Sequence, residues 1–128
     1  MTKKFEIRNS TAEFLIFMAE GKEDGIEVMY ADENIWCTQD AIANLFDKGR
    51  STIAEHLSNI FKEGELDKDS VCRNFRRTAG DGKSYNTQFY NLDAIISVGY
   101  RANSRRATQF RQWCTFVLRQ YAIRSLCA

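Results

Sequence analysis

The stretch that decides the fold is TQDAIANLFDKGRSTIAEHLSNIFKEGEL, residues 38–66. Its apolar residues recur at intervals of three and four on both sides of DKGR, residues 47–50. This period predicts two helices joined by a short turn. Two helices so joined form either an ordinary helical hairpin or a helix-turn-helix, whose second helix enters a groove of DNA. A helix-turn-helix would indicate DNA binding, whereas an ordinary helical hairpin would indicate only a structural role.

The flanking residues predict where the two helices begin and end. Thr38 is the expected N-cap of a first helix over about residues 39–46, because its hydroxyl can accept an amide hydrogen of the first turn. The second helix is expected to begin at residue 50 or 51 and to end at about 62 or 63, where Gly64 is a natural stop. We therefore place the helix pair over about residues 38–63.

A helix-turn-helix needs a small residue where its helices cross and an apolar anchor ten positions later. Ala43 and Ile53 have this spacing. In the turn, Asp47 stands where glycine is common, and we expect it to take the left-handed conformation that aspartate tolerates. We expect the stem of Lys48 to cover apolar surface while its ammonium stays in water, and Gly49 to relax the turn.

The second helix keeps polar side chains of the types that contact base edges and phosphates. These candidate DNA-binding residues are Arg50, Ser51, Thr52, Glu55, His56, Asn59 and Lys62. His56 is the only histidine, and we interpret it as a hydrogen-bonded helix residue rather than a catalytic one.

Two β-rich runs follow, over about residues 71–91, with turn residues between 78 and 84. A hairpin directly after a recognition helix has the position of a wing, which holds the DNA backbone or the minor groove. Its candidate backbone contacts are Arg73, Arg76, Arg77 and Lys83. The acidic run EGELDKD, residues 63–69, must then point away from phosphate.

The remaining segments complete one α+β domain over residues 1–128. EFLIFMAEG (13–21) and GIEVMYADENIW (25–36) are interpreted as a first hairpin, with glycines at both ends of its turn. Two C-terminal helices are expected over about residues 92–124. Asn91 and Ser104 are their expected N-caps. Gly99 has no side chain, so another element can pack closely against the first of these helices. The expected fold is therefore a winged-helix-like core with a hairpin before it and two helices after it.

Composition limits the function classes. A chain of 128 residues with 44% hydrophobic and 27% charged residues fits a single core. The net charge of +1 is unevenly spread. Residues 1–70 hold 8 Lys/Arg against 15 Asp/Glu, whereas residues 71–128 hold 10 against 2. The basic half points to a polyanion or an acidic partner, or the two halves attract each other.

Several motifs are absent from the sequence. The four cysteines have no C-x-x-C spacing, so we expect reduced thiols, mostly packed in the core, and neither a metal nor any other cofactor. The apolar run FLIFMA, residues 14–19, is too short for a signal sequence or a membrane span. A cytoplasmic protein without membrane contact is expected. No paired acidic motif, nucleophile elbow or Gly-rich phosphate loop favours an enzyme.

Two long segments resemble a known family. WCTQDAIANLFDKGRSTIAEHLSNIFKEGEL (36–66) and DGKSYNTQFYNLDAIISVGYRANSRRATQFRQW (81–113) are similar to the virulence protein RhuM family, found in bacterial genomic islands and prophage-like regions. The resemblance covers about residues 13–124 and implies a DNA-binding or phage-related regulator. Members usually have glycine and an aliphatic residue in place of Asp47 and Lys48, and they usually continue further, so we expect a truncated copy or an excised N-terminal domain.

A second resemblance covers residues 90–124. Their order is similar to the end of the Bro-N domain of phage antirepressors, which implies structural roles for Ser104, Ala107, Phe110 and Trp113. The preferred hypothesis is a regulator that binds double-stranded DNA as a homodimer, because one recognition helix reads few base pairs. The alternative is an antirepressor-like protein-interaction module without DNA binding.

Overall fold

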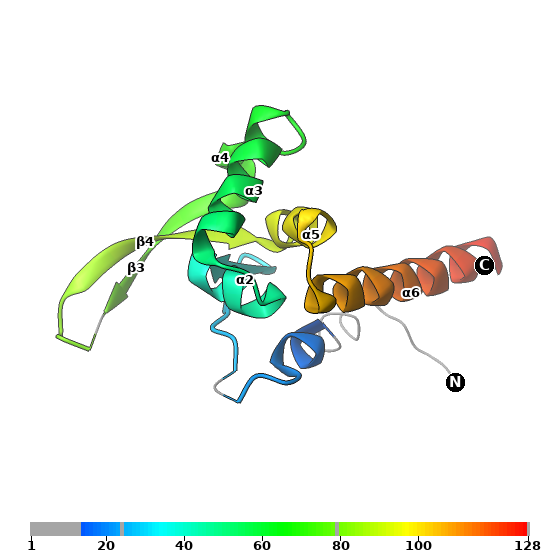
Figure 1. Cartoon of the computed structure of the whole chain (residues 1–128), viewed down its shortest axis with the longest axis horizontal. Helices are drawn as coiled ribbons and strands as arrows, with labels where there is room; N and C mark the ends of the chain where they lie inside the picture. The colour runs from blue at the N-terminus through cyan, green and yellow to red at the C-terminus, as the bar shows by residue number, and fades with distance from the viewer. Residues whose placement is uncertain (1–13, 24, 79, 128) are drawn as a thin grey trace.

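The chain folds around a four-stranded antiparallel sheet with helices packed on it (Figure 1). The computed structural model describes residues 14–23, 25–78 and 80–127. The strands lie in the order β1-β2-β4-β3. Their bounds are β1 Met29–Ala31, β2 Asn34–Thr38, β3 Cys72–Thr78 and β4 Ser84–Asn91. The helices are α2 Gln39–Phe46, α3 Arg50–Lys62, α4 Lys68–Val71, α5 Leu92–Arg101 and α6 Arg105–Cys127. A mixed α+β fold is confirmed, and the short helix α4 was not anticipated.

The predicted helix pair is α2 and α3. Thr38 caps α2, since its hydroxyl accepts a hydrogen bond from the amide of Ala41 at 3.1 Å. Asp47 ends α2 in the left-handed conformation, with φ 53°, as expected. Gly49 has φ −69°, which any residue adopts, so the turn does not depend on it. The ammonium of Lys48 donates to the carbonyl of Asn103 at 3.1 Å.

The first hairpin differs from the prediction, because residues 14–19 form a helical segment and not a strand. Phe14, Phe17 and Met18 are buried, while the residues between them are exposed. Positions i, i+3 and i+4 share one face of a helix, whereas a strand would bury alternate residues. The actual hairpin pairs β1 with β2, and its turn is made by Asp32 and Glu33, both at positive φ.

The C-terminal helices are capped as predicted. Asn91 accepts a hydrogen bond from the amide of Ala94 at 3.2 Å, and Ser104 accepts one from Ala107 at 3.0 Å. Gly99 lies against the ring of Phe110, so close that a Cβ on it would be 2.4 Å from the ring. Helix α5 therefore packs on α6 through a position that has no room for a side chain.

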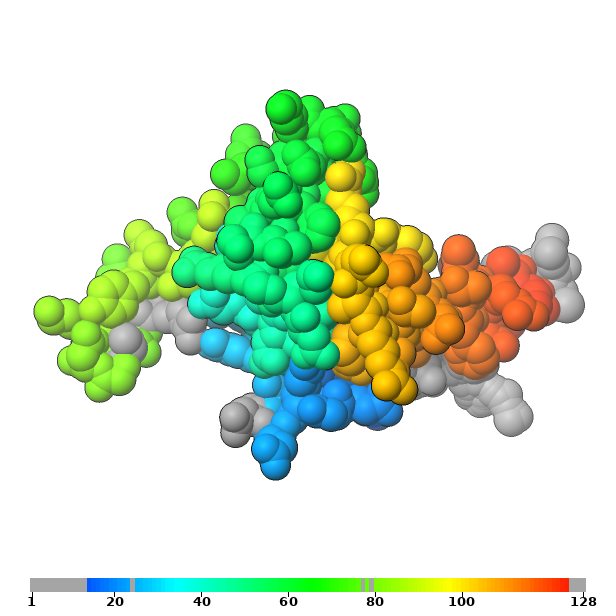
Figure 2. Space-filling model, viewed as in Figure 1, coloured from blue at the N-terminus to red at the C-terminus, as the bar shows by residue number. Residues whose placement is uncertain are grey.

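Two elements project from this body. The β3–β4 hairpin curves away on one side, and the second half of α6 extends on the other (Figures 1 and 2).

Of the cysteines with described side chains, Cys37 is fully buried and Cys72 and Cys114 are half-buried; all three are free. The side chain of Cys127 lies outside the described part. Among the described helices, none has the length and apolar character needed to cross a membrane.

Candidate nucleic-acid interface

Helix α3 has one buried face and one exposed face. Ile53, Leu57 and Ile60 are buried against the core, and Ala43 of α2 is buried opposite them. Four candidates are exposed and three are half-buried. The exposed ones are Arg50, Ser51, Glu55 and Lys62; the half-buried ones are Thr52, His56 and Asn59. The seven predicted residues therefore differ in how fully they reach solvent.

Sequence reasoning missed one residue of the exposed face. Ser58 is exposed and stands at helical spacing from Ser51, Glu55 and Lys62. Positions i, i+4, i+7 and i+11 fall on one side of a helix. The period that identified the buried stripe could have identified this opposite stripe.

A hydrogen bond and an ion pair connect the first residue of α3 to the first turn of α2. The side-chain amide of Gln39 donates to the backbone carbonyl of Arg50 at 3.1 Å. Asp40 forms an ion pair with the guanidinium of Arg50, with Oδ1 3.1 Å from Nε. Neither Gln39 nor Asp40 was a predicted site residue. Both contacts fix the position of Arg50 relative to the rest of the helix pair.

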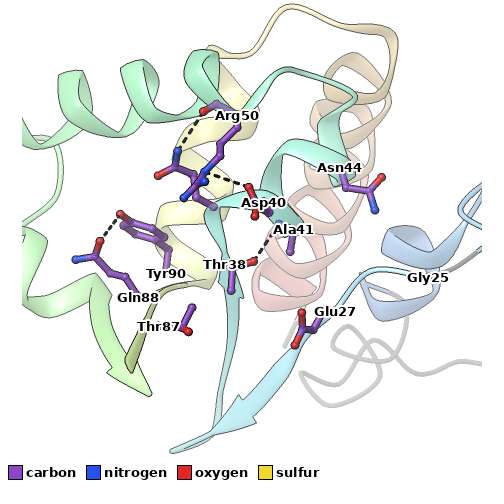
Figure 3. Close-up of a pocket in the computed structure, with 11 residues that line it drawn as sticks. Gly25, Glu27, Thr38, Asp40, Ala41, Asn44, Arg50, Thr87, Gln88 and Tyr90 are labelled. Carbon is purple, nitrogen blue, oxygen red and sulfur yellow. Dashed lines mark hydrogen bonds and ion pairs between the residues drawn. The ribbon is translucent and has the colours of Figure 1, made fainter. Parts of the chain in front are cut away.

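A hollow of about 420 Å³ lies beside this junction. Its walls come from α2, the first residue of α3, β4 and, before β1, Gly25 and Glu27 (Figure 3). Its polar lining side chains include Gln39, Asp40, Arg50, Thr87, Gln88 and Tyr90. The hollow brings the helix pair and the hairpin together, although 37 residues separate Arg50 from Thr87 in the chain.

The four predicted wing cations do not share one face. Arg73 pairs with Asp32 and stacks over the ring of Trp36, with 4.7 Å between the guanidinium carbon and the ring centroid. Arg76 and Lys83 are exposed and form no ion pair with any described residue. Because side chains alternate along a strand, Arg73 and Arg76 point to opposite faces of the hairpin. The side chain of Arg77 lies outside the described part.

The acidic run after α3 is partly neutralised within the chain. The guanidinium of Arg101 lies 2.8 Å from a carboxylate oxygen of Glu63 and 2.8 Å from one of Glu65. Hydrogen bonds from Arg101 lower the pKa of both carboxyl groups below the ordinary glutamate range, and the hydroxyl of Ser97 adds to this at Glu65. These two carboxylates thus face α5. No group of three or more His, Cys, Asp or Glu side chains within the described ranges could hold a metal ion.

Residues 70–127 match the model of the virulence protein RhuM family. The chain is therefore similar to that family over the β3–β4 hairpin, α5 and α6, while α2 and α3 lie outside the match. No curated protein matches the chain, and no solved structure does.

Proposed function

We propose that this chain is a RhuM-family regulator of a genomic island or prophage that binds double-stranded DNA. Helix α3 enters the major groove, and the β3–β4 hairpin acts as the wing. The observation that carries the proposal is the shared hollow, because Arg50 of α3 and Gln88 of β4 line the same concavity. The major groove of DNA admits a helix or a two-stranded ribbon, and here residues of both elements line one hollow.

The geometry of the helix pair supports a helix-turn-helix. Ala43 and Ile53 are both buried at the crossing, with relative exposures of 7% and 0%. Asp47 makes the tight turn with a left-handed backbone. The free face of α3 then carries hydroxyl, carboxylate and amino groups from Ser51, Glu55, Ser58 and Lys62. Serine and lysine side chains are common partners of phosphate oxygens.

The β3–β4 hairpin adds further cations to the proposed DNA-binding surface. Arg76 and Lys83 project from the hairpin without a carboxylate partner among the described residues. We propose a dimer in the cytoplasm, because one recognition helix reads few base pairs and paired half-sites extend the sequence that is read. The proposal involves binding alone, without a catalytic step or a cofactor.

The test is fluorescence anisotropy of a labelled duplex of random sequence, titrated with the full chain over a salt series. We expect the logarithm of affinity to fall with the logarithm of salt by about 0.9 per phosphate contact. The double variant Arg50→Ala with Asn59→Ala should bind more weakly. Arg119→Ala, which removes an exposed cation of α6, is the control and should bind as the parent does. No binding at low salt would refute the proposal.

A second candidate function is an antirepressor-like protein-interaction module. The observation that favours it is the projecting end of α6, where Leu118, Tyr121 and Ile123 are 66%, 54% and 50% exposed. Arg119 lies between Leu118 and Tyr121, Arg124 directly follows Ile123, and no acidic residue follows Asp93 in the given sequence. Such a surface suits an acidic amphipathic partner. Capture of one stoichiometric protein without nucleic acid, abolished by Leu118→Asp with Ile123→Asp, would favour this alternative.

A further inference from the structure

The two faces of the β3–β4 hairpin differ in chemistry. The register pairs Asn74 with Gln88, Arg76 with Asn86 and Thr78 with Ser84. Residues directly opposite each other share a face, and so do residues two apart along a strand. These six side chains therefore form one polar face, and all six are exposed. The other face carries Phe75 and Phe89, whose rings meet at right angles with 5.3 Å between centroids.

The polar face has a particular composition. It holds three carboxamides, one guanidinium and two hydroxyls, with neither an acidic nor an apolar side chain. Arginine pairs with guanine through two hydrogen bonds, asparagine and glutamine pair with adenine in the same way, and serine and threonine contact either base. A strand face that only meets solvent commonly mixes lysine with glutamate. Here every side chain is one that reads base edges.

The polar face continues toward α3. Tyr90 follows Gln88 on the same face, and its ring stacks on Phe61 of α3 with 6.4 Å between centroids. The hydroxyl of Tyr90 donates to the carboxamide oxygen of Gln88 at 3.2 Å (Figure 3). This bond orients the carboxamide of Gln88 within the hollow that Arg50 also lines. Of the polar face, Gln88 is thus the residue that lines the same hollow as the start of α3.

We propose that the β3–β4 hairpin reads base edges in the major groove through Asn74, Arg76, Asn86 and Gln88, beyond holding the backbone as a wing. A two-stranded ribbon fits the major groove, which is about 12 Å wide, and not the minor groove of about 6 Å. Successive side chains on one face of an antiparallel strand are about 6.8 Å apart, which matches two base-pair steps of about 3.4 Å. The two cross-strand pairs therefore meet base pairs two steps apart.

This inference rests on the proposed function, since it names the DNA chemistry that the hairpin recognises. Arg76 selects guanine and the carboxamides select adenine. Lys83, in the turn at the tip, has no place on the polar face and binds phosphate. The two cations of the hairpin thus have separable roles, and this separation can be tested.

The experiment selects bound duplexes from a library with a randomised interior of about 20 base pairs and sequences them. The full chain is compared with Arg76→Gln, Asn86→Ala and Lys83→Gln, of which the first and last lose the same charge. We expect Arg76→Gln to lose a guanine preference by about 5- to 150-fold at one position, and Asn86→Ala to lose an adenine preference. Lys83→Gln should keep every preference, bind all duplexes more weakly and reduce the salt slope by about 1.

Each other outcome overturns the inference. If Arg76→Gln and Asn86→Ala keep the preferences of the parent, the hairpin reads no bases and the proposed function stands through α3 alone. If the parent binds every duplex equally, DNA binding stands without base reading. If the parent binds no duplex, the proposed function fails together with this inference. Because the three side chains are exposed, unchanged circular dichroism should show that the variants are folded.

Discussion

Asp40, in the first turn of α2, holds Arg50, the first residue of α3, by an ion pair of 3.1 Å. The contact uses Nε of the guanidinium, and neither Nη atom has a side-chain partner among the described residues. Both side chains are exposed, at 68% for Arg50 and 71% for Asp40. Such an exposed pair contributes little to stability, so its main consequence is the charge and position that Arg50 presents to a ligand.

The substitution Asp40→Asn should therefore strengthen binding to DNA while leaving the fold intact. Removing this carboxylate takes one negative charge from the proposed interface and releases the guanidinium of Arg50. We expect affinity for a random duplex to rise several-fold at low salt, as measured by anisotropy. Asp93→Asn is the matched control, because Asp93 is also an exposed acid in the first turn of a helix, α5, and lines no part of the hollow. If both variants change the affinity for the duplex equally, Asp40 does not act through its contact with Arg50.

Local sequence patterns predicted most of the fold around the candidate interface. The three- and four-residue period and the cap Thr38 predicted the bounds of α2 and α3 to within a residue, and the caps Asn91 and Ser104 predicted where α5 and α6 begin. These features act over one or two turns, so they can be recognised without knowing the rest of the chain. Residues 14–19 were misassigned because a short apolar run fits a strand as well as a helix, and only its burial pattern separates the two.

The candidate interface itself could be predicted only in part. The residue types on α3 and the hairpin were visible in the sequence, but the register of β3 with β4 was not. That register decides that Arg76 joins Asn86 while Arg73 is turned toward Trp36 and Asp32. The pairing of Asp40 with Arg50 depends on the angle between two helices, which a spacing rule does not supply. Long-range geometry of this kind is set by the packing of the whole core.

A change at Gly99 should test the close contact of α5 with α6. A Cβ at this position would lie 2.4 Å from one ring carbon of Phe110 and 3.0 Å from the ring of Phe46. Because both rings are fully buried, they have little room to move. We expect Gly99→Ala to lower the free energy of unfolding by about 1–3 kcal/mol, measured by urea titration. Gly80→Ala, at a position with open space, should change it by less than about 0.5 kcal/mol.

Arg106 fastens the helical segment at residues 14–19 to α6. Its guanidinium donates to the backbone carbonyl of Phe17 at 2.8 Å and lies 4.3 Å from the centroid of that ring. Only 9% of the residue is exposed. We expect Arg106→Ala to lower the free energy of unfolding by about 1–3 kcal/mol, because the carbonyl of Phe17 loses its partner.

Amide hydrogen exchange should show which part of the chain Arg106→Ala destabilises. Amides of residues 14–19 should exchange faster in Arg106→Ala, while those of α3 should be less affected. Arg105→Ala removes the adjacent, exposed arginine and should change stability by less than about 0.5 kcal/mol. Uniform acceleration over the whole chain would show that Arg106 does not act on this segment in particular.

The carboxylates that face Arg101 should make stability depend on pH. The folded chain lowers the pKa of Glu63 and of Glu65 below the ordinary value of 4.5, chiefly through hydrogen bonds from Arg101. A lowered pKa in the folded state means that the unfolded state binds protons first as the pH falls. The stabilisation is therefore fully present above the ordinary glutamate value and is lost as the pH falls through the lowered values.

Urea titrations of the parent and of Arg101→Gln at pH 6, 5, 4 and 3 would measure this dependence. We expect the parent to be the more stable at pH 6 and the difference to shrink as the pH falls through the lowered pKa values of Glu63 and Glu65. The difference should also shrink at high salt, because both carboxylates are exposed to solvent and screened by ions. A difference that stays constant from pH 6 to pH 3 would mean that Arg101 stabilises the fold by packing alone.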